Sequence, residues 1–267
     1  MQGRLSPIVD GKIQSFPWKF WRNEFQDAKK IGLKLMEWTI DYENFYSNPL
    51  MTYDGRNEII NLSLENNVKI PSLTADCFMQ FPFWKASNNQ TNLQNDFLNL
   101  VDASSKIGIK FIILPLVDNG SLLTERDGKY LYDFLNDHTA HFKNSNIEIL
   151  FESDFSPKKL RNFISKFNNN YFGINYDIGN SASLGFSIEE EFKYYGKYIK
   201  NVHVKDRLLR GGTVPLGEGN ADFKKVFLYL KKHNYLGNLI LQTARAKNSN
   251  HCELINYYTK IVNNWLI

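Results

Sequence analysis

The stretch from Asn201 to Arg207, Asn-Val-His-Val-Lys-Asp-Arg, carries the residue types that most clearly indicate chemistry. Side chains alternate between two faces along a strand, so His203 and Lys205 share one face and the two valines share the other. An imidazole and an ammonium on one face, with the carboxylate of Asp206 beside them, are unusual in a packed core. The stretch therefore predicts the wall of a polar pocket.

Polar or charged side chains also end most of the other predicted strands. These strands cover residues 1–5, 34–40, 69–76, 110–116, 147–152, 172–178, 200–206 and 238–243. Ionisable groups are rarely buried unless they are paired or bound to a metal, so their convergence at one edge would favour a cation. In chain order the residues are Arg4, Glu37 with Asp41, Asp76, Glu152, Asp177, His203 with Lys205, and Gln242 with Arg245 just beyond it.

Helical patterns alternate with these strands along the whole chain. They cover residues 18–31, 55–66, 91–107, 124–142, 157–167, 187–198, 221–232 and 249–265. Gly32 and Gly108 follow two of the helices, and Ser156-Pro157 gives an N-cap with proline at the first helical position. Regular alternation over 267 residues predicts an α/β fold, a (β/α)₈ TIM barrel forming a single domain over residues 1–267. A doubly wound open sheet is the alternative, but the sequence has no GxGxxG or Walker motif.

A divalent metal ion is the simplest way to compensate carboxylates crowded at the barrel mouth. Glu152, Asp177, His203 and Gln242 end four consecutive predicted strands. Two carboxylates, an imidazole and an amide oxygen suit Mn²⁺, Mg²⁺, Co²⁺ or Zn²⁺. Each residue alone is more often a helix cap, an ion pair or a satisfied polar group, so the prediction of one metal ion depends on the whole set.

These residues resemble the xylose isomerase-like TIM barrels, the superfamily of sugar phosphate isomerases and epimerases and of endonuclease IV. The resemblance covers nearly the whole chain. It implies one divalent metal held by Glu, Asp, His and Glu on strands five to eight, with the two glutamates moving protons on opposite faces of a sugar. It rests on Glu152 in Leu-Phe-Glu-Ser, Asp177 in Tyr-Asp-Ile-Gly-Asn, His203 in His-Val-Lys-Asp, residues 215–219 (Pro-Leu-Gly-Glu-Gly) with Asp222-Phe223, and the last strand, residues 239–243.

Gln242 departs from that pattern, because it stands where the epimerases of this family have a second glutamate. An amide oxygen can ligate a metal, but an amide cannot act as a base near neutral pH. Two-base epimerisation would then need Lys205, Asp206 or Asp76 as a substitute, whereas an aldose–ketose isomerisation needs only one base, for which Glu152 is the candidate. A metal-dependent dehydratase or lyase acting on a polyhydroxy acid, and a sugar-binding barrel without activity, stay open as alternatives.

The nuclease branch of the superfamily fits the sequence poorly. Endonuclease IV-like DNA repair needs a three-zinc cluster rich in histidine, and of the five histidines only His203 ends a predicted strand. Asn180 stands where that branch has a histidine. The formal charge of +4 comes from dispersed lysines that are typical of solvated helix faces. We therefore expect a small carbohydrate as the partner and no nucleic acid.

Several residues near the strand ends are candidates for substrate binding. Arg207, Arg210 and Arg245 could bind a sugar phosphate, or could be surface arginines beside a flexible loop. The segment from Cys77 to Lys85 could be an aromatic lid over the sugar, a hydrophobic plug or a dimer contact. Trp38 should face the outer helices, and Cys77 should be a buried thiol. The full set of predicted substrate-binding residues is Arg4, Glu37, Asp76, Asp206, Arg207 and Arg245.

The remaining composition is that of an ordinary globular protein. The two cysteines, Cys77 and Cys252, have no CxxC spacing, which fits a reducing compartment and disfavours a disulfide framework. There is no apolar run of membrane-spanning length and no apolar signal core near residue 1. We therefore expect a cytoplasmic protein without a membrane partner, and by analogy with the family a homo-oligomer stays open.

Overall fold

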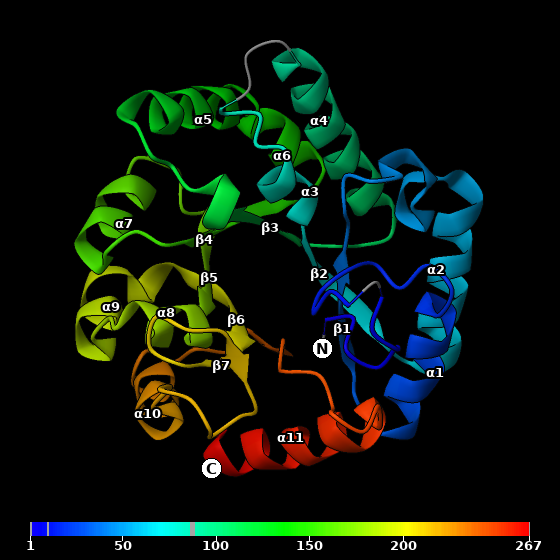
Figure 1. Ribbon diagram of the computed structural model, residues 1–267. Helices are drawn as coiled ribbons and strands as arrows, with labels where there is room; N and C mark the ends of the chain where they lie inside the picture. The colour runs from blue at the N-terminus through cyan, green and yellow to red at the C-terminus, as the bar shows by residue number, and fades with distance from the viewer. Residues whose placement is uncertain (1, 10, 86–88, 267) are drawn as a thin grey trace.

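Seven parallel strands form a nearly closed barrel in the structure, a computed structural model that describes residues 2–9, 11–85 and 89–266 (Figure 1). The order around the sheet follows the chain, as expected for strands joined by right-handed crossovers. The predicted (β/α)₈ class is confirmed, although one of its eight strands is reduced to a bridge. The strands are β1 (Leu35–Thr39), β2 (Lys69–Thr74), β3 (Phe111–Leu116), β4 (Glu148–Ser153), β5 (Phe172–Asp177), β6 (Ile199–Val204) and β9 (Asn238–Leu241).

The N-terminal segment closes the barrel between β9 and β1. Gln2 forms a single parallel bridge with Glu37 of β1, and its N–H donates to the carbonyl of Leu241 on β9 at 3.1 Å. The strand predicted over residues 1–5 is therefore one bridging residue in the described part, and Met1 lies outside that part. The glycine at position 3 follows in the left-handed region (φ 47°), which ends the extended pairing at once.

Helices surround the barrel and pack on its outer face, as Figure 1 shows. The helix predicted over 124–142 is broken at His138, which leaves helical geometry (φ −99°, ψ 10°). The flanking helices are α1 (Trp21–Lys30), α2 (Tyr53–Asn66), α4 (Gln90–Lys106), α5 (Glu125–Asp137), α6 (Thr139–Asn144), α7 (Pro157–Ile164), α9 (Ile188–Tyr195), α10 (Phe223–Lys232) and α11 (His251–Leu266).

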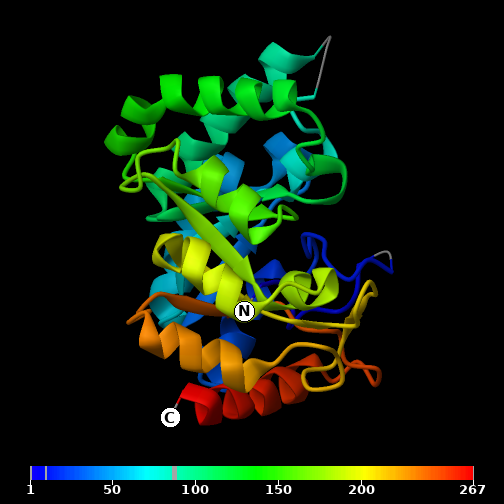
Figure 2. The same ribbon diagram turned by 90° about the vertical axis from the view of Figure 1, so that its left-hand side faces the viewer.

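Short elements that the sequence pattern did not indicate lie at the carboxyl ends of the strands. They are α3 (Asp76–Gln80) after β2, α8 (Ile178–Leu184) after β5, and the hairpin of β7 (Asp206–Arg207) with β8 (Thr213–Val214) after β6. In Figure 2 the N-terminal loop, the hairpin and the segment after β9 project from the same side of the barrel. These additions build the rim of a site on that side.

The hydrophobic core lies between the sheet and the helices, whereas much of the barrel interior is polar. Trp38 is buried in the outer layer, as predicted, with its ring against Phe16 and Trp21. Interior positions of such barrels are usually filled by branched apolar residues. Here the buried interior includes Glu37, Ser72, Thr74, Asn175, Asn201 and His203.

Among the described helices, none is long and apolar enough to cross a membrane.

Candidate active site

A pocket of about 630 Å³ opens at the carboxyl ends of the strands. Acids, amides and cations from seven parts of the chain line it, which is the arrangement expected at the catalytic end of a TIM barrel. The functional side chains in its wall include Gln14, Asp41, Asp76, Glu152, Asn180, Lys205, Arg207 and Gln242.

His203 lies below this pocket and joins two sets of carboxylates. Its Nε2 is 2.8 Å from Glu37 Oε1, while its Nδ1 is 3.1 Å from Glu152 Oε2 and 3.7 Å from Asp177 Oδ2. The parallel register puts Asp177 of β5 beside His203 of β6, which explains the approach. The hydrogen bond to Glu37 fixes the ring so that Nδ1 faces the two acids.

Glu37 is held by hydroxyl and amide donors from neighbouring strands. Ser72 donates to Oε2 at 2.7 Å, Thr74 donates to Oε1 at 2.8 Å, and Asn201 donates to Oε2 at 3.2 Å. The side chain of Glu37 is fully buried and lies beneath the pocket. It therefore orients His203 and is not among the residues that line the pocket, and its contact with substrate stays a prediction.

Two amides hold the carboxylate of Glu152 from both sides. Asn175 Nδ2 donates to Oε2 and Asn180 Nδ2 donates to Oε1, each at 2.7 Å. Asn175 in turn accepts a hydrogen bond from Asn201 at 2.8 Å through its Oδ1. Glu152 thus reaches the pocket wall in a fixed orientation, with neutral donors on both oxygens.

Asp177 and Gln242 share the ammonium group of Lys205. Lys205 Nζ lies 2.9 Å from Asp177 Oδ2 and donates to Gln242 Oε1 at 2.7 Å. The other end of the Gln242 amide donates to Gln2 Oε1 at 2.5 Å. Asp177 also caps α8, since its Oδ1 accepts from the N–H of Asn180 at 2.8 Å.

Asp76 forms a second polar group on the β1–β2 side of the pocket. Its Oδ2 accepts hydrogen bonds from Gln14 Nε2 at 2.5 Å and from Thr39 Oγ1 at 2.9 Å. Gln14 presents its amino end because Arg4 Nη2 donates to its Oε1 at 3.2 Å. Asp76 starts α3 directly after β2, so the strand end and the short helix together set its position.

The electrostatics of the two sides of the pocket are opposite. Burial alone would raise the pKa of Asp177, but Lys205 and His203 outweigh it and hold that pKa well below its usual range. Burial alone would lower the pKa of His203, but the facing carboxylates raise it well above its ordinary value. For Asp76 burial prevails, with a contribution from Asp41, and its pKa rises to about 7.

Glu152, Asp177 and His203 fit the requirements of a metal site. One ligand atom from each lies within 4.8 Å of the others, and all three residues are buried. Asp177 Oδ2 accepts no properly oriented hydrogen bond from the described residues, although it faces the charge of Lys205. Carboxylate oxygen and imidazole ligands suit a hard or borderline divalent cation.

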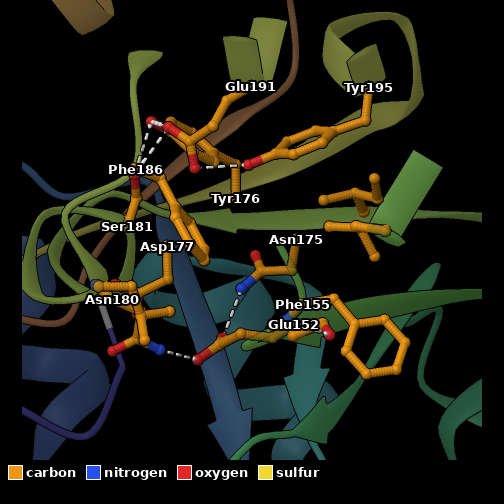
Figure 3. Close-up of a pocket in the computed structure, with 14 residues that line it drawn as sticks. Glu152, Phe155, Asn175, Tyr176, Asp177, Asn180, Ser181, Phe186, Glu191 and Tyr195 are labelled. Atoms are coloured by element: carbon orange, nitrogen blue, oxygen red, sulfur yellow. Dashed lines mark hydrogen bonds between the residues drawn. The ribbon is translucent and has the colours of Figure 1, made fainter. Parts of the chain in front are cut away.

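A small cavity is lined by Glu152 and by a second buried carboxylate (Figure 3). Glu191 of α9 accepts hydrogen bonds from Tyr176 at 2.8 Å, Ser181 at 2.7 Å and Tyr195 at 2.6 Å. Figure 3 shows this group apart from the amides that hold Glu152. Its hydroxyls satisfy the acid and join α8, α9 and β5, so this carboxylate holds the wall of the site together.

Two other predicted substrate-binding residues, Asp206 and Arg245, contact backbone groups of nearby loops. Asp206 is fully buried, and its carboxylate accepts from the N–H groups of Gly217, Gly219 and Ala221 at 2.8–3.1 Å, so it shapes the loop after the hairpin. Arg245 donates to the carbonyls of Gly3 and Ser6.

Arg4 is buried next to the Asp76 group, and burial lowers its pKa to about 10. Of the three arginines expected near a phosphate, Arg207 lines the pocket and Arg210 is exposed. The structure thus brings Glu152, Asp177, His203, Lys205 and Gln242 together. It leaves Asp206 outside this group, since the carboxylate of Asp206 is occupied by loop N–H groups.

The aromatic segment from Cys77 to Lys85 is a plug and not a lid. Phe78, Phe83 and Trp84 are buried, and the rings of Phe78 and Phe83 pack against Phe97 of α4. From this segment only Met79 and Gln80 line the pocket. Cys77 is fully buried, as predicted.

Several residues of the site were not predicted from sequence. A period of two along a strand would have found Asn201 from His203 and Asn175 from Asp177, since each pair shares the inner face. The same period would have found Thr39 from Glu37 on β1. Gln14 had no such signal, because its role depends on a loop conformation. The missed residues are Gln2, Gln14, Thr39, Asn175, Asn180 and Asn201.

Comparisons with solved structures show the same fold at low sequence identity. D-psicose 3-epimerase from Clostridium cellulolyticum H10, solved with D-tagatose, has a TM-score of 0.74 at 10% identity, covering 92% of this chain and 93% of that chain. The IOLI protein with a bound zinc atom has a TM-score of 0.75 at 15% identity, covering 92% of each chain.

Curated relatives match over most of their length. A putative L-ribulose-5-phosphate 3-epimerase, SgbU, of Haemophilus influenzae is 25% identical over 245 residues, 85% of each chain. The L-ribulose-5-phosphate 3-epimerase UlaE of Escherichia coli O1:K1 is 24% identical, covering 83% of this chain and 81% of that protein. The family model described as a xylose isomerase-like TIM barrel matches residues 25–257. This chain therefore belongs to the xylose isomerase-like TIM barrel family.

Proposed function

We propose that the protein is a metal-dependent isomerase or epimerase of a small sugar or sugar phosphate, with Glu152 as the base that removes a proton next to a carbonyl. The observation that carries this proposal is the convergence of Glu152, Asp177 and His203 within 4.8 Å beneath an open polar pocket. The relatives named as 3-epimerases of a ketose phosphate support the substrate class. Within that class they favour an epimerase.

Glu152, Asp177 and His203 would hold a divalent cation, one of Mn²⁺, Mg²⁺, Co²⁺ or Zn²⁺, with the amide oxygen of Gln242 as a fourth ligand. Bound there, the cation supplies a Lewis acid that polarises the substrate carbonyl. His203 already presents Nδ1 to the two acids because Glu37 holds its other nitrogen. Loading the metal would release the proton from that nitrogen, so binding should strengthen as pH rises.

Lys205 has a second role in this proposal. Its ammonium lies between Asp177 and Gln242, two of the proposed metal ligands. A metal ion held there would compete with the ammonium for the same oxygens, and Lys205 would then be free to contact a substrate oxygen in the pocket that it lines. We therefore assign Lys205 to the stabilisation of negative charge on the substrate.

Glu152 is suited to move a proton because its carboxylate is fixed before substrate arrives. Asn175 and Asn180 hold both oxygens, so little reorientation is needed at the moment of transfer. The proton moves from the carbon next to the carbonyl to a Glu152 oxygen, and the carbon–hydrogen electron pair forms the double bond of an enediolate.

Arg207 is the residue best placed to recognise a phosphate. It lines the pocket, its Nη1 donates to Asn180 Oδ1 at 2.7 Å, and its Nε and Nη2 donate to the carbonyl of Gly211 at 3.0 and 2.8 Å. Arg245 donates to the carbonyls of Gly3 and Ser6 and is not among the residues that line the pocket. A phosphorylated substrate should therefore depend on Arg207.

The test is proton exchange in D₂O with Mn²⁺ and a panel of pentoses, hexoses and their phosphates. We expect deuterium at the carbon next to the carbonyl, and a loss of about 10³-fold or more in Glu152→Gln with metal content measured in parallel. Glu125→Gln, an exposed position on α5, is the matched control. Exchange that persists in Glu152→Gln, or no exchange with any sugar, would exclude the proposal. Loss of water from a polyhydroxy acid without exchange would instead identify the dehydratase alternative.

A further inference from the structure

The pocket holds one more carboxyl group that is suited to proton transfer. Asp76 lines the pocket, is 6% exposed, and is fixed through one oxygen by Gln14 and Thr39. Both hydrogen bonds that the described residues give it end on Oδ2. Its Oδ1 is therefore left to carry a proton or to face a substrate.

Gln242, Lys205 and Asp206 have other contacts or roles and do not supply the second proton-transfer group. Gln242 is an amide, with one end on Lys205 and the other on Gln2. Lys205, whose ammonium lies between Asp177 and Gln242, is assigned to the stabilisation of negative charge on the substrate. Asp206 accepts three backbone N–H groups of the loop after the hairpin and does not line the pocket.

Asp76 and Glu152 approach the pocket from different directions. Asp76 follows β2 and Glu152 lies on β4, with β3 between them in the sheet. Both line the same pocket, and the charge of Glu152 acts on Asp76. Inversion at one carbon needs one group to remove a proton and a second group to return one from another direction, which a single carboxylate cannot do.

We propose that Asp76 is the catalytic acid that returns a proton to the enediolate after Glu152 has removed one. The role rests on the proposed function. Glu152 takes the proton from carbon, the carbonyl oxygen takes up the electron pair, and the Asp76 carboxyl then gives its proton to that carbon as the carbonyl re-forms. Glu152 ends protonated and Asp76 ionised, and proton exchange with solvent through the open pocket restores both. The reverse reaction uses the two groups in exchanged roles.

The protonation state of Asp76 is consistent with this role. Burial raises its pKa to about 7, so a neutral acid and a carboxylate are both populated near neutral pH. The titratable groups that act on it are Arg4, which favours its charge, and Asp41 and Glu152, which oppose it; it also acts on the buried thiol of Cys77. The hydrogen bonds from Gln14 and Thr39 favour the ionised form and do not overcome burial.

The test compares two rates for Asp76→Asn in the Mn²⁺-loaded full-length protein in D₂O, with the sugar or sugar phosphate that is active in the panel. We expect formation of the epimer to fall by about 10² to 10⁴-fold. Deuterium should still enter the recovered substrate at a rate within a few-fold of wild type, since Glu152 can remove and return the proton on its own. Asp96→Asn is the control, because Asp96 is also a buried aspartate and bonds Tyr42 and Tyr46 away from the pocket.

Gln242→Glu in the Asp76→Asn background gives a second readout, since a new carboxylate at the mouth should restore part of the lost epimer formation. Equal losses of exchange and product would show that Asp76 is structural, and unchanged product formation would also overturn its role. No exchange and no product in wild type would instead overturn the proposed function, and this role with it.

If Asp76→Asn does not fold, Thr39→Val carries the test. It removes one donor to the ionised carboxyl, so the pH at which epimer formation changes should move upward while the maximum rate is retained. A folded Thr39→Val protein with an unmoved pH profile would overturn the role of Asp76.

Discussion

Asp177 and Asp76 are the same residue type at the ends of two strands of one barrel, and both are buried, yet their electrostatics differ in sign. Asp177 faces Lys205 and His203, and its pKa is held well below the usual range. Asp76 receives hydrogen bonds from neutral donors and feels the charges of Asp41 and Glu152, and its pKa rises to about 7. Burial is common to both, so the charge of the neighbours decides the protonation state.

The difference divides the mouth of the barrel into two working sides. The β4–β6 side keeps Asp177 ionised, as a carboxylate ligand of a metal ion must be. The β1–β2 side keeps one acid near its neutral form, as a proton donor must be. Pairs of titratable groups whose surroundings push their pKa values apart are a physical basis for assigning roles in a site.

The largest predicted effect comes from removing the imidazole of His203 on the β4–β6 side. His203→Asn would leave Glu37, Glu152 and Asp177 as three buried carboxylates without the imidazole between them. Loss of one partner from a buried ion pair costs about 3–5 kcal/mol of unfolding free energy. Urea unfolding at pH 7 without added metal measures it. His233→Asn, an exposed position at the end of α10, should change little, and equal losses in the two variants would contradict the comparison.

The β1–β2 side should show the opposite pH dependence. The folded protein holds a proton on Asp76 up to pH about 7, whereas the unfolded chain releases it near the ordinary value of 3.8. Wild-type stability should therefore fall, relative to Asp76→Asn, as pH rises from 4 to 7, by at most about 4 kcal/mol, and then level off. Thermal unfolding of both proteins across this range tests it, and a constant difference would show that Asp76 is not protonated in the fold.

The sequence was sufficient to predict the barrel and the residues at its mouth because both depend on local patterns. Alternating strands and helices give the fold class. The alternation of side chains puts His203 and Lys205 on one face, and the position of each residue near a strand's end puts Glu152, Asp177 and Gln242 near them. The metal itself stays a prediction that the geometry supports.

The positions of the other predicted site residues depended on contacts between segments that are distant in the sequence. Glu37 was predicted to contact substrate because a strand pattern gives the face on which a side chain lies, but not whether it reaches the pocket. In the structure Glu37 is fully buried and contacts His203. Asp206 appeared at the mouth because the hairpin that turns it toward Gly217 and Gly219 has no sequence signature. The segment from Cys77 to Lys85 stayed open between a lid, a plug and a dimer contact because its aromatic residues fit both a pocket and the packing against α4 that the structure shows.

A third buried carboxyl group, Glu191, tests whether the neighbours of a buried acid also set its pKa away from the mouth of the barrel. Glu191 forms no ion pair among the described residues and receives three hydroxyl hydrogen bonds, and burial raises its pKa as it does for Asp76. Tyr195→Phe removes one of these donors and should cost about 1–2 kcal/mol of unfolding free energy. Urea unfolding measures it, with Tyr194→Phe, a half-buried neighbour on α9, as the control. A loss no greater than the control's would show that the hydroxyl contributes nothing to holding the acid.

The smallest predicted effect shows how much of the raised pKa of Asp76 comes from burial and how much from the charge of Asp41. Asp41 is partly exposed and is held by Gln80 and by the N–H of Phe16, and its charge is one of the causes that raise the pKa of Asp76. Asp41→Asn should lower that pKa by a few tenths of a unit, because solvent screens a partly exposed charge. Titration of the Asp76 carboxyl by carbon NMR measures the shift, and Asp137→Asn, exposed at the end of α5, should give none. A fall of two units or more would mean that Asp41, and not burial, sets the protonation of Asp76, and the contrast with Asp177 would then be one of charge alone.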